Sequence, residues 1–237
     1  MINVTAEEMR RIDKLATEKY GIRLEQMMEL AGYHLADMAK GIFNGSLGDK
    51  RVLVLSGKGN NGAGGLVCAR HIMNRGGDVT VVIPARAELS PVTRGRLETL
   101  EILDTRVFSF RDFKQLDKAS SEADLIIDSL IGYGLVGDPR PPISEMIEWA
   151  NYGGVQILSL DIPSGLDTTT GKAHSPCIMA SSTLTLALPK KELLAEGARE
   201  YVGGLYLADI GIPPFLYKEI GFDVGEIFRE DGVVRLF

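Results

Sequence analysis

Short, nearly continuous apolar runs recur along this chain, and they constrain its fold more than any other feature. Examples are VLVL at 52–55, VTVVI at 79–83, LII at 125–127 and ILSL at 157–160. A strand has such a continuous apolar sequence when helices cover both faces of its sheet, because neither row of its side chains is exposed to water. The runs predict strands at 51–56, 78–83, 106–110, 123–128, 155–161, 182–188 and 204–208.

Helical patterns lie between these strands. They predict helices at 66–74, 91–103, 112–118 and 142–151. Strands that alternate with helices form βαβ units, and such units build an open parallel sheet. We therefore expect an α/β fold, a three-layer αβα Rossmann-like architecture with a doubly wound, mostly parallel sheet.

Two further helices are predicted before the first strand. Thr5 and Glu8 form a capping box, which marks a helix start, and a second apolar periodicity covers 24–42. The methionine-rich face of the second helix is typical of a core or a subunit contact, and not of a cofactor site. We expect a single domain over 1–237, with a helical extension at 1–48 and the Rossmann-like core at 49–237.

Composition excludes several classes of protein. The chain has 26 Lys and Arg residues against 32 Asp and Glu, a net charge of −6, which argues against a nucleic-acid binder. No apolar run reaches the roughly 18 residues that span a bilayer, and the N-terminus lacks the pattern of a signal peptide. Two isolated cysteines indicate neither a disulfide framework nor a zinc site. A cytoplasmic protein that binds neither nucleic acid nor membrane is expected.

Polar residues follow several predicted strands. Asn61 follows the first, Asp128 ends the fourth, Asp161 ends the fifth, and Ser164 comes soon after. Ligands of open α/β sheets bind at these carboxyl ends. Asn61, Asp128 and Ser164 offer hard oxygens and no soft ligand, which suits a cation. The alternative is that Asp128 only caps a turn.

Two glycine-rich segments are candidates for ligand contact. Residues 57–62 match G-x-G-x-x-G, which suits a pyrophosphate at a helix N-terminus. A dinucleotide-binding dehydrogenase also needs an acidic residue at the end of the second strand, where this chain has Ile83-Pro84. An NAD-dependent oxidoreductase is therefore disfavoured, and a tight turn explains the glycines equally well. Residues 131–143 form the second segment, whose alternative is a surface loop.

Six segments, in order, resemble the NAD(P)H-hydrate epimerases, the family of the YjeF N-terminal domain and of the apolipoprotein A-I-binding protein. They are MMELAG, NNGAGGLVCAR, DSLIGYGLVGD, LDIPSGLD, TLTLALPKKEL and GGLYLADIGIP. The resemblance covers essentially the whole chain. It implies an isomerase that interconverts the R and S forms of hydrated NADH or NADPH (NADHX and NADPHX), in which water has added to the nicotinamide ring.

The resemblance also implies roles for particular residues. A potassium ion would be held by Asn61, Asp128 and Ser164. Substrate would contact Asn60, Asn61, Gly62, Ala63, Gly64, Gly132, Tyr133, Gly134, Leu135, Val136, Gly137, Asp138 and Asp161. Because epimerisation needs a group that moves protons, Asp161 is the first catalytic candidate. Lys190 is the second, and the alternative for Lys190 is an ordinary surface lysine.

Two departures from the family pattern leave a second function open. The family's loop Asp is Gly64 here, and the Asn of its N-terminal helix motif is Leu30. Loss of that carboxylate is compatible with a nucleotide-binding or dimeric interaction module of reduced or lost activity. As an epimerase, the chain is expected to form a homodimer and to act with a separate NAD(P)H-hydrate dehydratase.

Overall fold

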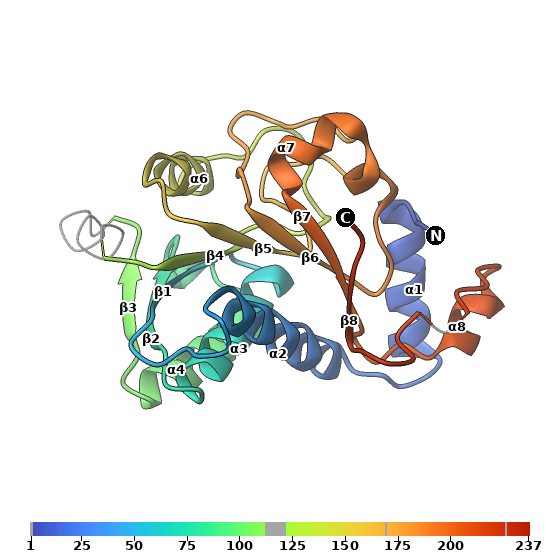
Figure 1. The fold of residues 1–237 in the computed structure, drawn as a ribbon, viewed down its shortest axis with the longest axis horizontal. Coiled ribbons are helices and arrows are strands. Elements are labelled where there is room, and N and C mark those ends of the chain that lie inside the picture. The colour runs from blue at the N-terminus through green and yellow to red at the C-terminus, as the bar shows by residue number, and fades with distance from the viewer. Residues whose placement is uncertain (1, 112–121, 169, 226) are drawn as a thin grey trace.

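One sheet runs through the centre of the molecule, as the computed structural model shows for residues 2–111, 122–168, 170–225 and 227–237 (Figure 1). In those residues it has eight strands, in the order β3-β2-β1-β4-β5-β6-β7-β8. The strands are β1 (Arg51–Ser56), β2 (Asp78–Ile83), β3 (Arg106–Ser109), β4 (Leu125–Ser129), β5 (Ile157–Leu160), β6 (Ser182–Leu186), β7 (Gly204–Ala208) and β8 (Val233–Arg235). All seven predicted strands are confirmed and differ from the prediction only at their ends.

The sheet is parallel except at its last strand. Strands β1 to β7 pair in parallel, and β8 pairs antiparallel with β7 through Leu207 and Val234. The sequence did not predict β8, because three residues are too few to show a period. Strand order reverses between β1 and β4, so the chain leaves these neighbours in opposite directions. The doubly wound, mostly parallel sheet is confirmed.

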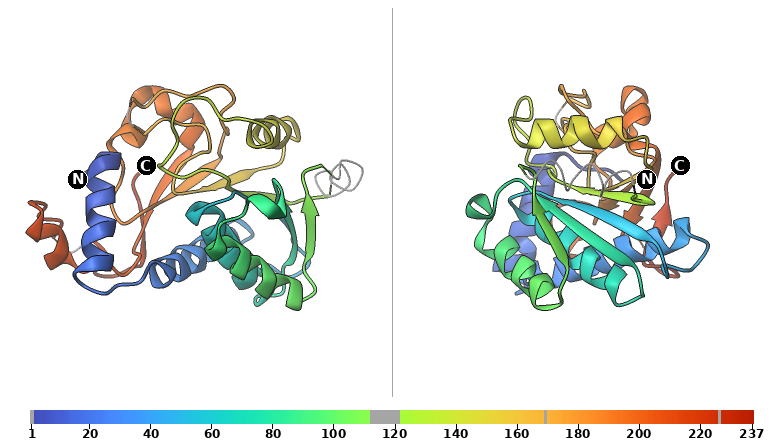
Figure 2. Two further views of the ribbon diagram at one scale, coloured as in Figure 1. Left: turned by 180° about the vertical axis from the view of Figure 1, so that it is seen from behind. Right: turned by 90° about the vertical axis from the view of Figure 1, so that its left-hand side faces the viewer.

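Helices cover both faces of the sheet (Figures 1 and 2). Helices α2, α3 and α4 lie on one face, α6 and α7 on the other, and α1 and α8 lie near the β6–β7 end. Their bounds are α1 (Ala6–Glu18), α2 (Leu24–Ile42), α3 (Asn60–Met73), α4 (Pro91–Ile102), α6 (Ile143–Tyr152), α7 (Arg199–Val202) and α8 (Pro214–Glu219). Single 3-10 turns occur at Arg86–Glu88, Lys191–Leu194 and Glu196–Ala198. The helix predicted at 112–118 lies outside the described residues.

Strand β1 shows why the apolar runs are continuous. Val52 and Val54 join the core cluster that includes α2 and α3, whereas Leu53 and Leu55 join the cluster on the opposite face with α6. All four side chains are buried. Alternate residues of a strand point to opposite faces, so a strand between two helical layers is apolar at every position.

The prediction that residues 60–65 form a loop is wrong. Helix α3 begins at Asn60, so the glycine-rich segment is its first two turns. Glycine has low helix propensity, which favoured a loop. The structure supplies the reason for glycine instead: a Cβ at Gly65 would lie 1.9 Å from Ser129 Oγ on β4. The missing side chain lets α3 approach the sheet at the point of reversal.

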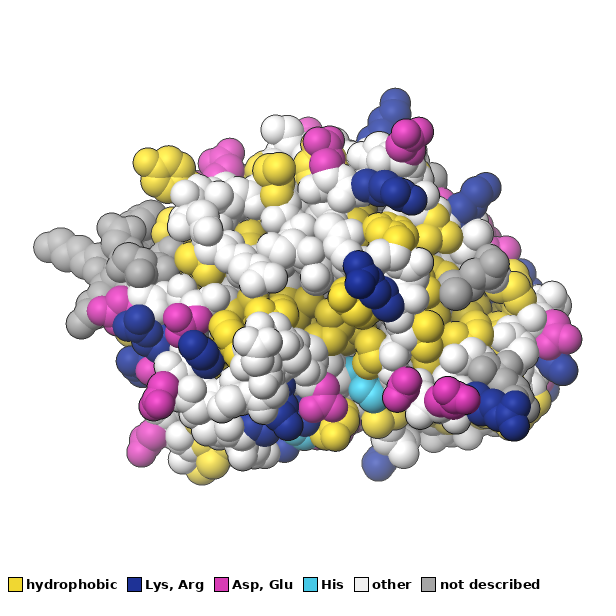
Figure 3. All heavy atoms as spheres, in the orientation of Figure 1, with side chains coloured by type: hydrophobic (Ala, Val, Ile, Leu, Met, Phe, Trp, Pro, Cys, Tyr) yellow, Lys and Arg dark blue, Asp and Glu magenta, His cyan; other side chains and the backbone are white. Residues whose placement is uncertain are grey.

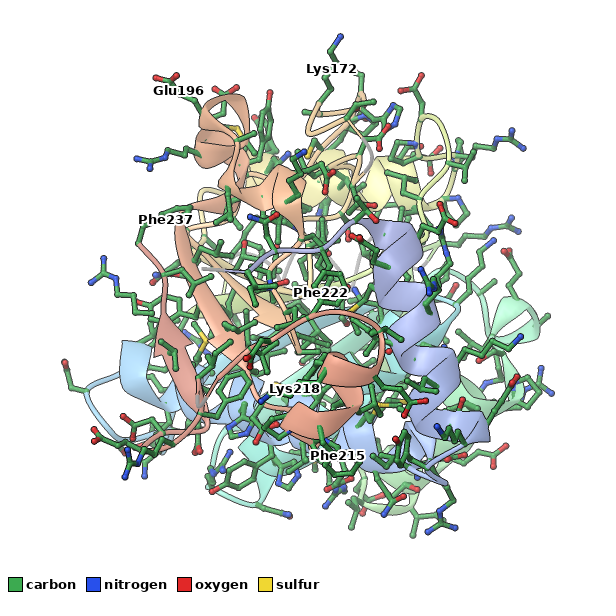
Figure 4. The ribbon with its side chains drawn as sticks, turned by 90° about the vertical axis from the view of Figure 1, so that its right-hand side faces the viewer. Lys172, Glu196, Phe215, Lys218, Phe222 and Phe237 are labelled. Atoms are coloured by element: carbon green, nitrogen blue, oxygen red, sulfur yellow. The ribbon has the colours of Figure 1, made fainter. Side chains whose placement is uncertain are left out.

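The two N-terminal helices pack against different parts of the fold. Helix α2 packs on α3, where a Cβ at Gly32 would lie 2.6 Å from Val67 Cγ1. Helix α1 is fixed at its start, because Val4 bridges to Lys190 beyond β6. At the other end of α1 the Tyr20 ring lies 5.3 Å from that of Phe215 on α8. Figure 4 shows α1 beside this C-terminal segment.

The surface carries charges of both signs. On the face seen in Figure 3, acidic and basic side chains are scattered around a central band of apolar ones. The described helices include none that is both long and apolar enough to cross a membrane.

The close approach of α3 gives a stability prediction. In Gly65→Ala the new Cβ collides with Ser129, so α3 has to shift, and we expect a loss of about 1–3 kcal/mol in the free energy of unfolding. Gly95→Ala is the matched control: Gly95 lies inside α4, and its Cβ position has no described atom within 4 Å. That variant should gain up to about 1 kcal/mol. Equal urea midpoints for the two variants would contradict the packing argument.

Candidate functional site

A cavity of about 500 Å³ opens at the carboxyl ends of the central strands, within the size range of small-molecule sites. It lies where strand order reverses, with α1 and α2 forming its outer wall. Its lining comes from five parts of the chain: Met9, Asp13, Leu24, Met27, Met28 and Ala31; Lys58, Gly59, Asn60, Asn61 and Gly64; Leu130, Ile131, Gly132, Tyr133, Gly134 and Ile143; Leu160 and Asp161; Leu186, Lys190 and Ile210.

The start of α3 forms one side of this cavity. Gly59 is its N-cap, and no side chain of the described residues caps the helix there. The carbonyl of Lys58 accepts from Ser90 N at 2.9 Å and from Thr93 Oγ1 at 3.0 Å, so the start of α4 holds the preceding turn. An uncapped helix N-terminus beside a cavity favours an anion, because free N–H groups and the helix dipole point at it.

Asn61, Gly132 and Asp161 converge on one point of the cavity. A Cβ at Gly132 would lie 3.4 Å from Asn61 Oδ1 and 3.4 Å from Asp161 Oδ2. The Asn61 amide nitrogen donates to the carbonyl of Leu160 at 3.3 Å, which turns its oxygen toward Gly132. The absence of a side chain at Gly132 leaves this amide and carboxylate accessible from the cavity.

Asp161 and Lys190 form a buried ion pair. Lys190 Nζ donates to Asp161 Oδ1 at 2.5 Å and to the carbonyl of Leu186 at 3.0 Å. The Lys190 side chain is 1% exposed and the Asp161 side chain 5%, so the alternative of a surface lysine is wrong. Asp161 also has φ +66°, a conformation that costs energy in a residue with a side chain and often marks functional sites.

A second carboxylate, Asp13 on α1, lines the same cavity. Tyr133 Oη donates to Asp13 Oδ2 at 2.5 Å. Burial raises the pKa of Asp13, and the hydrogen bond from Tyr133 opposes this rise without cancelling it. Burial also raises the pKa of the Tyr133 hydroxyl, so the tyrosine is the proton donor of the pair. Lys190 Nζ lies 5.9 Å from the centre of the Tyr133 ring, which places this pair beside the first.

Asp128 and Ser164 are in contact below the cavity. Asp128 Oδ1 accepts from Ser164 Oγ at 2.6 Å and from Leu130 N at 3.2 Å. Its Oδ2 accepts from Ser164 N at 2.9 Å and from Ser159 Oγ at 2.8 Å. Burial raises the pKa of this carboxyl, and the hydrogen bonds oppose the rise. Asp128 thus ties β4 to the segment after β5 through Ser164. Its hydrogen bond from Leu130 N is the turn cap that the alternative interpretation expects.

Several predicted site residues lie away from the cavity lining. Gly62 and Ala63 are buried on the inner side of α3. Leu135, Val136, Gly137 and Asp138 continue past the lining; Val136 is 89% exposed, and Asp138 Oδ1 lies 3.0 Å from His174 Nδ1.

Sequence reasoning missed the residues that α1, α2 and the β1 turn contribute. Met9 and Asp13 lie one helical turn apart on α1, and Lys58 lies in the turn after β1. Met27 and Met28 are buried, as a core face requires, but they also line the cavity. The prediction that this methionine face takes no part in a ligand site is therefore wrong for this candidate site. The available signal was Asp13 itself, a carboxylate next to the apolar positions of an amphipathic helix.

Comparisons with known proteins identify the family of this chain. The sequence profile described as YjeF-related protein N-terminus matches residues 24–192. An NAD(P)H-hydrate epimerase of Dehalogenimonas lykanthroporepellens is 40% identical over 92% of this chain and 85% of that protein. A bifunctional NAD(P)H-hydrate repair enzyme of Moorella thermoacetica is 37% identical over 90% of this chain and 41% of its own length. The crystal structure of yeast YNL200c, 26% identical, matches with a TM-score of 0.85 over the full length of both chains.

The buried pair gives a second stability prediction. Lys190→Met leaves the Asp161 carboxylate buried without its cation, so we expect the free energy of unfolding to fall by about 3–5 kcal/mol. Adding Asp161→Asn should recover part of that loss, because the unpaired charge is gone. Lys191→Met is the control: its side chain is exposed, and the change should stay within about 0.5 kcal/mol. Urea unfolding measures all three, and a Lys190→Met midpoint equal to wild type would exclude a structural role.

Proposed function

We propose that this chain, which belongs to the family of YjeF-related protein N-termini, is an NAD(P)H-hydrate epimerase. It interconverts the R and S forms of hydrated NADH and NADPH and so contributes to cofactor repair. The observation that carries the proposal is the 40% identity to an NAD(P)H-hydrate epimerase over most of both chains. A cavity with a buried acid–base pair, at the ligand-binding edge of the sheet, supports it.

The anionic part of the substrate fits the start of α3. A dinucleotide carries a pyrophosphate, and the uncapped N-terminus offers N–H groups and a partial positive charge. Lys58 lies in the turn before it and lines the cavity. Its ammonium pairs with Glu88 in the structure and would have to exchange this partner to contact the pyrophosphate. The point shared by Asn61, Gly132 and Asp161 lies in the same cavity, and we assign the hydrated ring to it.

Asp161 and Lys190 supply proton transfer at the ring. Inverting one carbon requires breaking and remaking one of its bonds, and a positioned acid or base assists both events. Asp161 faces the cavity and is oriented by Lys190 Nζ at 2.5 Å. Lys190 in turn is fixed by the carbonyl of Leu186, so the carboxylate is held before substrate arrives.

A potassium ion held by Asn61, Asp128 and Ser164 is part of the proposal. Ser164 Oγ and Asp128 Oδ1 lie 2.6 Å apart, so rotating the serine hydroxyl proton away leaves two adjacent hard oxygens for a cation. One carboxylate supplies one negative charge, which suits a monovalent ion better than calcium. When bound, the ion supplies positive charge beside the strand ends and offsets the charge of Asp128.

The proposal also covers the oligomeric state, the partner enzyme and the location of the protein. A homodimer is supported by Leu30 and Tyr33, large apolar side chains on α2 that are 38% and 41% exposed. This chain covers 41% of the length of the bifunctional repair enzyme. A separate NAD(P)H-hydrate dehydratase that acts with this chain is part of the proposal. A cytoplasmic location stays a prediction from composition.

The activity test follows conversion of R-NADPHX to the S form, with an S-specific dehydratase in excess. Wild-type protein should accelerate conversion well beyond the spontaneous rate, and Asp161→Asn should lower kcat by about 100-fold or more, because proton transfer is lost. Asp231→Asn, a change at an exposed position, should match wild type. A wild-type rate equal to the spontaneous rate contradicts the proposal and favours a nucleotide-binding module.

The cation test compares nucleotide affinity in potassium and in tetramethylammonium buffers. Wild-type protein should bind NADPH about 5- to 150-fold more tightly in potassium, the usual range of coupling between two sites. Asp128→Asn should remove that difference, because the amide leaves no negative charge for the ion. Equal wild-type affinity in both buffers rules out the ion site and leaves Asp128 as a turn cap.

A further inference from the structure

From the geometry we infer that Asp13, together with Tyr133, is a second proton-transfer group of this site, serving the face of the ring opposite to Asp161 and Lys190. The inference rests on the proposed epimerase function and deepens it. Three observations carry it: a shared cavity, two hydrogen-bonded pairs within it, and the fixation of α1. The inversion itself adds the chemical requirement for a group on each face of the ring.

The two pairs share one cavity but come from different parts of the fold. Asp161 and Lys190 follow strands β5 and β6, whereas Asp13 lies on α1, and Tyr133 lies beyond β4. All four residues line the cavity. The Tyr133 ring lies beside both pairs, with its hydroxyl on Asp13 and Lys190 Nζ 5.9 Å from its centre. A ligand in this cavity therefore meets a carboxylate from the sheet and another from the outer helix.

Helix α1 is held at both ends, so Asp13 is a fixed group. At its start, Val4 N donates to the carbonyl of Pro189 at 3.0 Å, and Lys191 N donates to the carbonyl of Val4 at 2.9 Å. At its other end, Lys19 and Tyr20 both contact the Glu219 carboxylate of α8. These contacts place Asp13 at the cavity with no help from substrate, and fixed groups make efficient catalysts.

The Asp13 environment suits a group that both gives and takes a proton. Burial favours its neutral form, whereas the hydrogen bond from Tyr133 and the charge of Lys190 favour its anion. Asp161 adds a like charge that again favours the neutral form. The net effect is a raised pKa, which brings the carboxyl closer to the working pH of a cytoplasmic enzyme.

Inversion of the hydrated carbon needs groups on both faces. Water adds to an enamine at the carbon next to nitrogen, so the hydrated carbon bears a hydroxyl beside the ring nitrogen. In one direction its C–O bond breaks, the departing oxygen takes a proton from one group and leaves as water, and the nitrogen lone pair forms a C=N bond. A water molecule then forms a C–O bond on the other face and gives its proton to the second group.

The protons balance if the site has two groups, each of which can either donate or accept a proton. One proton passes from the first group to the second, and the reverse reaction returns it. Asp161 with Lys190 serves one face, and Asp13 with Tyr133 serves the other. The carboxylate that the family pattern places at position 64 is absent from this chain, yet the cavity still holds one carboxyl for each face.

The deciding variant is Asp13→Asn, which keeps an oxygen to accept the Tyr133 hydrogen bond but cannot transfer a proton. We expect kcat to fall by about 100-fold or more in both directions, R to S and S to R. Binding of NADPH, measured by calorimetry, should stay within threefold of wild type. Glu18→Gln is the matched control, because it removes one carboxylate from the exposed face of the same helix and should leave kcat unchanged.

Tyr133→Phe provides a second and independent readout. Among the described residues, the titratable groups that interact with Asp13 are Tyr133, Lys190, Asp161 and Tyr217 of α8. Arg10 lies 5.7 Å from the Tyr133 ring centre. Since the Tyr133 hydrogen bond lowers the pKa of Asp13, its loss should move one limb of the pH profile of kcat/KM to higher pH. A purely structural tyrosine would leave that limb in place.

The outcomes separate this inference from the proposed function. An active wild-type protein whose Asp13→Asn variant keeps kcat overturns the inference and leaves the epimerase function standing. An inactive wild-type protein overturns both. If Asp13→Asn fails to fold, the pH profile of Tyr133→Phe decides: a shifted limb supports the inference, and an unshifted one overturns it.

Discussion

The approach of helix α3 to the sheet, at the reversal between β1 and β4, is the contact on which the site depends. Gly65 touches Ser129 where any side chain would collide, and this lets the first turn of α3 lie directly over the strand ends. That turn carries Asn61 and an uncapped helix N-terminus into the cavity. A larger residue at Gly65 would lift the helix, and Asn61 would lose its position beside Gly132 and Asp161.

Burial of charge is the second organising constraint. Lys190 is almost entirely buried, and a lone ammonium in such a place is costly unless a carboxylate pairs with it. Asp161 supplies that carboxylate, and it adopts a left-handed backbone conformation in that position. The same pair therefore contributes to the stability of the fold and is also the pair for which we propose proton transfer. The segments after β5 and β6 are held together by groups that also line the cavity.

Much of the site could be predicted from the sequence, because parallel strands place their carboxyl ends at one edge. Polar residues at those ends, such as Asn61 and Asp161, were expected to converge, and the structure brings them to one point. Asp13 could not be predicted in this way. It lies far away in sequence on a helix whose pattern shows only which side is apolar. Lys190 was a candidate from resemblance, but its burial and its partner required the fold.

The architecture follows from the amino-acid pattern alone. Apolar runs without alternation require helices on both faces of the sheet, and their number and spacing require parallel strands joined by helical crossovers. The local pattern gave a wrong prediction where a residue type is needed for a contact with a distant part of the chain. The glycines at the start of α3 indicated a loop, but they lie in a helix and allow it to pack closely on the sheet. The packing of the complete fold is what places α1 against the cavity and brings Asp13 beside Tyr133. The apolar side of a helix shows which of its faces is buried. It does not show which other helix or strand covers that face, because this depends on how all the elements of the fold pack together.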